Sequence, residues 1–434
     1  MLKTFKNLWS IADLRKKIIY TLLILVVFRI GSVITVPYLN TDSLQKMMGS
    51  SDGNNMINYI DIITGGAFSK ATIFALSISP YITSSIIIQL LTVAIPSLEK
   101  LQKEGEEGRK VLNKITRWST VGLGILQSLL YYRLLKSQSG AIAYTTGFYG
   151  AFAMIVIILT FTAGTALIMW LGERISEKGI GNGISIILFA GIVSRGPAVI
   201  KQLMQYAELK GSESYFKIPL VIVTFLAIMV FVVFVTGGER KVPIQYGKRV
   251  IGRKMYGGQS SYIPIKLNMS GVMPIIFANS ILVLPSTIQM FADPNGTTWI
   301  GKVLRHFNYT SWIYAVATFI LIIMFSYFYV SISFNAMEMA NNLKKSNGAI
   351  PGIRAGKPTA DFISKTMSHT TFVGALFLGF MAILPFLVGK GTGMQLGIGG
   401  TTILILIGVA LDTLKNIQSG MMMRNHKGFL LEKS

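Results

Sequence analysis

Residues 74–91 read FALSISPYITSSIIIQLL, and this stretch decides between a soluble fold and a membrane-embedded one. It is long and apolar enough to cross a hydrocarbon core of about 30 Å as a helix. It nevertheless carries a proline, which we expect to kink the helix, together with hydroxyl and amide side chains: Ser77, Ser79, Pro80, Thr83, Ser84, Ser85 and Gln89. We therefore expect one face of this helix to contact something other than lipid.

The rest of the chain has the composition of a polytopic membrane protein. Of its 434 residues, 51% are hydrophobic and only 14% are charged. Such a composition is not typical of a soluble globular surface. Apolar runs bounded by charge, Gly or Pro predict ten spans: 18–36, 73–95, 118–135, 148–171, 184–200, 219–236, 270–290, 312–332, 370–388 and 401–414. An even number of spans places both termini on the same side of the membrane.

The distribution of Lys and Arg orients these spans. Most of them fall before the first span, in alternate loops and in the tail 415–434, so the positive-inside rule makes both termini cytoplasmic. The net charge of +23 is then mostly cytoplasmic. Residues 1–17 place Phe5, Leu8, Trp9 and Ala12 on one helical stripe, which favours a helix in the headgroup layer. A frayed basic tail is the alternative.

Three cytoplasmic segments are longer than a connection requires: 96–118, 237–269 and 341–369. The second is strongly basic, through Arg240, Lys241, Lys248, Arg249, Arg253 and Lys254. Such residues attract anionic lipid, and they can also contact RNA phosphates or an acidic protein face. The length of these loops favours a docking surface for a large partner over lipid contact alone.

The sequence offers no catalytic or cofactor motif. Its three histidines are far apart, it has no cysteine, and none of its Gly-Lys pairs is followed by Ser or Thr. We therefore expect no metal, no cofactor and no enzymatic activity, and any directional work has to come from a partner. Ionisable residues within the spans are scarce; Arg29 is an exception, which we expect to snorkel or to be paired.

Within the opening stretch, Ile78, Ile82, Ser85 and Gln89 recur at helical spacing. Two isoleucines beside hydroxyl groups are compatible with a narrow apolar constriction that closes a pore by dewetting. Helix packing through small residues explains the hydroxyl groups equally well. The preceding segment, 57–72, is apolar but short and is broken by two glycines, which is typical of a re-entrant element buried in protein.

Five stretches, in order, resemble the SecY proteins, the central subunits of bacterial protein-conducting channels. They are TGGAFSKATIFALSISPYITSSIIIQLLTV, KEGEEGRK, GERISEKGIGNGISIILFAGIV, NMSGVMPIIFANSILVLPSTI and PGIRAGKPT. The resemblance covers essentially the whole chain. It implies an all-α fold with two pseudosymmetric five-helix halves, 18–200 and 219–414, joined by an external hinge loop at 201–218, around an hourglass pore with a re-entrant plug.

The same resemblance implies the functional residues. A ring of aliphatic side chains would seal the pore: Ile78, Ile82, Ile184, Leu188, Ile276 and Ile405. The plug would span about 58–69 and include Ile62, Ile63, Gly65, Gly66 and Phe68. A lateral gate would open between the second and third spans and the seventh and eighth, with Gln89, Gln127 and Asn279 as its polar contacts. Partner docking would use Arg240, Lys241, Lys248, Arg249, Arg253 and Arg354, although Ala355 replaces a proline that is frequent in the family.

By resemblance, the function is passive conduction of unfolded secretory polypeptides across a bacterial plasma membrane, with sideways release of hydrophobic segments into lipid. The partners implied are SecE-like and SecG-like subunits, a SecA-like ATPase motor, the ribosome, signal peptides, nascent chains and anionic lipids. A secondary transporter would instead require convergent polar groups at mid-membrane. A membrane anchor for the basic loops would leave the plug-like segment unexplained.

Overall fold

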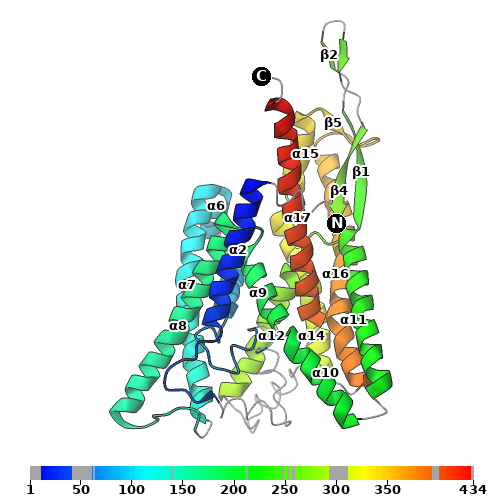
Figure 1. Cartoon of the computed structure of the whole chain (residues 1–434). Coiled ribbons are helices and arrows are strands. Elements are labelled where there is room, and N and C mark those ends of the chain that lie inside the picture. The colour runs from blue at the N-terminus through cyan, green and yellow to red at the C-terminus, as the bar shows by residue number, and fades with distance from the viewer. Residues whose placement is uncertain are drawn as a thin grey trace.

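A computed structural model describes residues 11–41, 61, 64–137, 140–210, 214–246, 249–251, 254–256, 260–292, 311–392 and 400–431. The chain is mainly helical, and long helices run roughly side by side along the molecule (Figure 1). Each of the ten predicted spans falls on a helix. Within the described residues, six helices are long and apolar enough to cross a membrane by length and composition, and a bent pair would make a seventh.

The first half of the chain contributes seven helices within its described part. They are α2 (Ala12–Gly31), α5 (Ser79–Ala94), α6 (Pro96–Lys103), α7 (Glu106–Ser137), α8 (Gly147–Lys178), α9 (Gly183–Ser194) and α10 (Gly196–Lys210). The axes of α5 and α6 differ by 101°. Pro96 causes this bend, because a proline disfavours helical backbone at the preceding residue, and Ile95 is extended.

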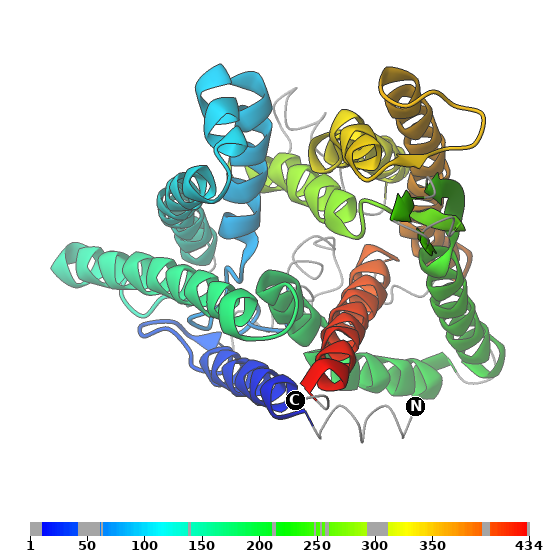
Figure 2. The ribbon, with the colours of Figure 1, turned by 90° about the horizontal axis from the view of Figure 1, so that it is seen from above.

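The second half contributes α11 (Ser214–Gly237), α12 (Met273–Ala292), α14 (Trp312–Ser333), α15 (Ala336–Lys345), α16 (Lys357–Thr392) and α17 (Gly400–Leu431). Seen from above, the helices of the first half other than α10 lie on one side of the molecule and those of the second half on the other (Figure 2). Helix α10 lies beside α11, and α9, α12 and α17 lie nearest the centre. A hydrophobic core between the sets joins residues of α2, α5, α8 and α9 to residues of α12 and α17. The first set also has a core of its own, and a further core joins Ile86 of α5 to residues of the second set.

The long segments 237–269 and 341–369 contain strands that the sequence did not predict. Strand β1 (Glu239–Tyr246) pairs antiparallel with β4 (Ser260–Lys266) and, at its end, with β5 (Gly348–Ala349); β2 (Arg249–Ile251) pairs with β3 (Lys254–Tyr256). Inward side chains of β1 and β4 pack on α15 and on the nearby ends of α14 and α16. Strands β1, β4 and β5 lie at the end of the molecule where α6 and the last turns of α17 lie, and β2 extends beyond that end (Figure 1).

Two local expectations were wrong. The second span was expected to be helical from residue 73, but α5 begins at Ser79, and Pro80 lies in its first turn instead of kinking its middle. A proline is well tolerated there because a first-turn N–H has no partner within the helix. The segment 201–218, expected to be a hinge loop, is helical along most of its described length, in α10 and the start of α11.

Candidate pore, plug and lateral gate

The six residues predicted to form the pore ring lie in one hydrophobic cluster. Ile78, Leu188, Ile276 and Ile405 are buried in it, and Ile82 and Ile184 are partly buried against it. They come from the start of α5, from α9, from α12 and from α17, so both halves of the chain contribute. The structure thus brings all six together at the junction of the two sets of helices.

The position of α9 is set by a close approach to α8. A Cβ built on Gly183 would lie 2.0 Å from the carbonyl oxygen of Gly172, so a side chain at Gly183 would force the helices apart. The Ser176 hydroxyl accepts a hydrogen bond from the Gly183 N–H (2.9 Å) and donates one to the Gly172 carbonyl (3.1 Å). Asn182 caps α9 by accepting from the N–H of Ile184 (3.1 Å). These contacts hold the start of α9, and with it Ile184.

A second close approach positions the other half of the ring. A Cβ on Gly408 of α17 would lie 2.2 Å from Cγ1 of Val272, just before α12. Gly271 has φ +62°, a backbone conformation that glycine adopts without strain. The turn into α12 can therefore lie directly against α17, which places Ile276 and Ile405 in the same cluster.

The plug segment is described by Asp61, which has helical conformation, and by residues 64–69, which form turns. Ile62 and Ile63, also predicted to belong to it, lie outside the described residues. Gly65 and Gly66 have φ of +70° and +86°, as tight turns require. A Cβ on Gly65 would lie 2.9 Å from the Gly191 carbonyl of α9 and 2.8 Å from the Ser194 hydroxyl. The plug segment is thus pressed against the end of α9.

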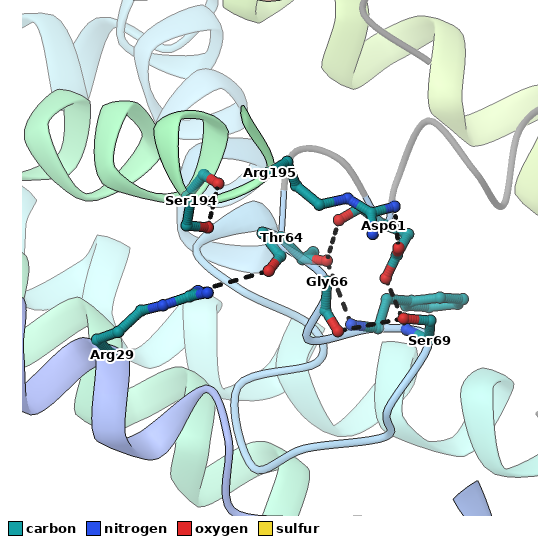
Figure 3. Close-up of polar contacts among 10 residues, drawn as sticks. Arg29, Asp61, Thr64, Gly66, Ser69, Ser194 and Arg195 are labelled. Atoms are coloured by element: carbon teal, nitrogen blue, oxygen red, sulfur yellow. Dashed lines mark hydrogen bonds and ion pairs between the residues drawn. The ribbon is translucent and has the colours of Figure 1, made fainter. Parts of the chain in front are cut away.

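Asp61 organises this turn (Figure 3). One carboxylate oxygen accepts from the N–H of Ser69 (2.7 Å), and the other forms an ion pair with Arg195. The Asp61 carbonyl accepts from the N–H of Gly66 (2.8 Å). Its side chain is 1% exposed, whereas that of Arg195 is 26% exposed. Neither residue was singled out from the sequence, because 133 positions separate the two along the chain.

Two further contacts hold the plug segment. Arg29 of α2 donates to the Gly65 carbonyl (3.5 Å), so this arginine is paired within the protein. Tyr131 of α7 donates to the carbonyl of Phe68 (2.6 Å), and the two rings lie 4.5 Å apart. The aromatic contact continues from Tyr131 to Phe161 of α8. Phe68 is therefore fixed to the first half of the chain.

The predicted lateral gate is a packed interface in this structure. Helix α12 contacts both α5 and α7. Ile86 of α5 is buried in one cluster with Ile275 and Phe277 of α12. Asn279 is also buried, and its amide nitrogen has no hydrogen-bond partner among the described residues. Gln89 donates to Ser85 of its own helix (3.4 Å).

Gln127, the third predicted contact of the gate, is half-buried on α7. The structure records no hydrogen bond that joins the described side chains of Gln89, Gln127 and Asn279 to one another. The three residues therefore lie on three of the four helices of the predicted gate, α5, α7 and α12, without a recorded hydrogen bond between them.

The predicted docking residues lie on the strand-bearing end. Arg240, Lys241 and Arg354 are exposed, and the Lys241 ammonium lies 4.7 Å from the centre of the Tyr262 ring. Arg249 belongs to β2, while Lys248 and Arg253 lie outside the described residues. Pairing of β1 with β5 joins the two basic segments into one unit. Sequence reasoning had treated these segments as separate loops.

A cavity of about 360 Å³ opens beside the ring cluster and shares Val272, Met273 and Val409 with it. Its polar wall was not predicted, and it includes Asn182, Lys266, Asn268, Asp412, Lys415 and Asn416. Lys266 is the last residue of β4, so the cavity lies toward the strand-bearing end. Asp412 lies near the end of the last predicted span, and this position was the only feature of the sequence that could have drawn attention to it as a functional residue.

Comparison with protein families gives one match: the SecY family model covers residues 72–414. Among curated proteins, the chain is similar to the protein translocase subunit SecY of Streptomyces galbus. The two are 42% identical over 443 residues, which is 99% of this chain and 100% of the relative.

Two solved structures have a similar fold. One is described by the statement that the plug domain of the SecY protein stabilises the closed state of the translocation channel and maintains a membrane seal (TM-score 0.64, 19% identity, 93% of this chain and 92% of the other). The other is Sec61 in the canine ribosome-channel complex from the endoplasmic reticulum (TM-score 0.62, 18% identity, 93% and 92%).

Proposed function

Since this chain belongs to the SecY family, we propose that it is the channel through which unfolded secretory polypeptides cross the plasma membrane. The observation that carries the proposal is the ring cluster, in which aliphatic side chains of both halves meet between the two sets of helices. An apolar constriction excludes water and ions when empty, because its walls offer them no hydrogen bonds. It can still let a polypeptide pass, because no specific contact has to be broken.

We propose that the plug segment and the pore ring seal the channel at rest. The plug segment lies against α9, the helix that also carries Ile184 and Leu188 of the ring. Two barriers in series would limit ion leakage better than one. The proposal is supported by the fold that this chain shares with the structure whose description assigns a membrane seal to the plug domain of the SecY protein.

The lateral gate in this proposal opens between α5 and α7 on one side and α12 and α14 on the other. Sideways release is then a partition equilibrium between pore and lipid. A twenty-residue apolar segment at roughly −0.5 kcal/mol per residue gains about 10 kcal/mol in lipid, whereas one central Arg opposes entry by about 3 kcal/mol. The gate would therefore sort membrane segments from secreted chain without chemistry.

We assign to partner proteins the energy that drives a polypeptide through the channel in one direction. The exposed residues Arg240, Lys241 and Arg354 form a basic surface on the strand-bearing end, to which a SecA-like ATPase motor or the RNA of a ribosome could bind. The similarity in fold to Sec61 in a ribosome-channel complex supports the ribosome as one of these partners. The assignment places this end and both termini in the cytoplasm, with SecE-like and SecG-like subunits and anionic lipids around the helices.

Reconstitution tests the proposal. The chain is purified with its small membrane subunits, placed in lipid vesicles, and supplied with the motor, ATP and a secretory substrate. The expected result is substrate that becomes protected from added protease and is digested once detergent opens the vesicles. Substrate that stays accessible, in vesicles where an established translocase protects it, would contradict the proposed function.

A further inference from the structure

The ion pair between Asp61 and Arg195 joins the two barriers of the closed channel. Asp61 belongs to the plug segment, and Arg195 is the C-cap residue of α9. The same short helix carries Ile184 and Leu188 of the ring. At 1.5 Å per residue, Leu188 and Arg195 lie about 10 Å apart along the helix. A displacement of α9 at the ring would therefore move Arg195 as well.

The environment of the pair makes the loss of either partner costly. The Asp61 carboxylate is almost fully buried, and a buried charge that loses its partner is strongly destabilised. Arg195 retains access to solvent, so its guanidinium can be rehydrated when it leaves. The free-energy cost of separating the pair is therefore the cost of leaving the Asp61 carboxylate buried without its partner. That cost is relieved only when the plug segment moves and the carboxylate reaches water.

The other end of the plug segment is attached differently. Phe68 packs its ring on Tyr131 and accepts a hydrogen bond from it, and neither contact involves α9. A few residues later, Ile73 and Val36 donate backbone hydrogen bonds to Ile34 and Ala71 and tie the chain to the segment after α2. This end would stay in place when α9 moves.

We propose that the Asp61–Arg195 ion pair is a latch that couples the ring to the plug. A polypeptide that widens the ring displaces α9, Arg195 leaves Asp61, and the plug segment swings away about its fixed contact between Phe68 and Tyr131. Arg195 acts here as a positioning residue. The inference rests on the proposed channel function and adds the contact through which occupancy of the ring releases the plug.

Single-channel recording in planar bilayers tests the latch with the complex of the chain and its small subunits. Asp61→Asn removes the charge but retains an oxygen for the Ser69 N–H, and Arg195→Ala removes the partner. We expect either variant to raise the probability of ion-conducting openings at rest about tenfold, and Arg195→Lys to raise it less. Arg174→Ala is the matched control, because it breaks an exposed ion pair with Glu177 and should change nothing.

A covalent lock provides a second measurement, in which one protein is compared with itself before and after reduction. The natural chain has no cysteine, and a Cβ on Gly65 would lie 2.8 Å from the Ser194 hydroxyl. Gly65→Cys with Ser194→Cys, added to Arg195→Ala, should form a disulfide on oxidation. The disulfide should return resting conductance to the natural level, and dithiothreitol should restore the leak.

The outcomes separate the latch from the channel function. If the natural complex translocates substrate but Asp61→Asn and Arg195→Ala conduct no more than Arg174→Ala, the latch is wrong and the channel function stands. A leak that persists under the formed disulfide also overturns the latch. If the natural complex protects no substrate, the channel function itself fails.

Discussion

The side chains of Ile78 and Ile184 both pack against Gly172, which has no side chain of its own. A Cβ built on that glycine would lie 3.6 Å from Cδ1 of Ile78 and 3.4 Å from Cγ1 of Ile184. The two isoleucines belong to the start of α5 and to α9, and Gly172 belongs to α8. Three elements of the first half thus converge where the ring residues of the second half also pack.

Polar substitution of the ring should open it to ions. Replacing Ile82, Ile184 and Ile276 together by Asn gives water hydrogen-bonding groups at the constriction, so dewetting no longer closes it. We expect a raised ion conductance of the resting complex in a planar bilayer. The matched control replaces the same three residues by Leu, which conserves volume and apolar character. Equal conductance of the Asn and Leu variants would show that these residues do not form the seal.

The contact between α8 and α9 should be sensitive to a single methyl group. In Gly183→Ala the new Cβ would collide with the Gly172 carbonyl, and α9 would have to shift. Overpacking of this kind costs about 1–3 kcal/mol. We expect a lower midpoint of thermal unfolding in detergent, together with a leak at rest.

Gly122→Ala serves as the control for this substitution. Gly122 lies within α7, and nothing is found within 4 Å of its added Cβ. Alanine there should stabilise the helix by about 0.5–1 kcal/mol. If the Gly183→Ala protein has the same unfolding midpoint and the same resting ion conductance as Gly122→Ala, the close approach of the two helices is contradicted.

The lateral gate should close more firmly when Asn279 becomes Leu. The amide nitrogen of Asn279 is buried without a partner among the described residues, and such a group costs about 1–3 kcal/mol. Leu of similar size removes that cost from the closed state. We expect moderately hydrophobic test segments to be secreted by the variant, although the natural channel inserts them in lipid. An unchanged hydrophobicity threshold in a glycosylation or protease assay would argue against a role for Asn279 in the gate.

Charge reversal on the strand-bearing end should weaken partner binding and leave the fold intact. Arg240→Glu with Arg354→Glu changes two exposed side chains, so we expect little effect on stability. Affinity for the motor and for ribosomes should fall, and more so at low salt, because charge attraction is screened by ions. Lys136→Glu, on the exposed last turn of α7, is the control. Equal binding by both proteins would rule out these arginines as docking residues.

The parts of the fold that sequence predicted well are those with a strong local signal. Each of the ten spans overlaps a helix, and 184–200 overlaps both α9 and α10, because a long apolar run has few other ways to satisfy its backbone in lipid. The start of α5 was misplaced because Ser77 adopts φ +51°, a backbone state that composition does not reveal. The ring residues came from the family resemblance, and in the structure they lie in one cluster.

The features that sequence reasoning missed depend on contacts between distant positions. Pairing of Gln245 with Ala349 unites two segments, although each of them had been considered only as a basic loop. The contact of Tyr131 with Phe68 and the ion pair of Asp61 with Arg195 likewise join different elements. A single sequence contains no periodicity that links such positions.

Crosslinking to a polypeptide arrested in transit tests the central claim most directly. Because the chain has no cysteine, Ile82→Cys places a unique thiol in the ring, and Trp118→Cys places one on an exposed face of α7. The account predicts that a secretory chain bearing a single cysteine crosslinks to position 82 and not to position 118. Efficient translocation without a crosslink at position 82, or with equal crosslinking at both positions, would contradict passage through the ring.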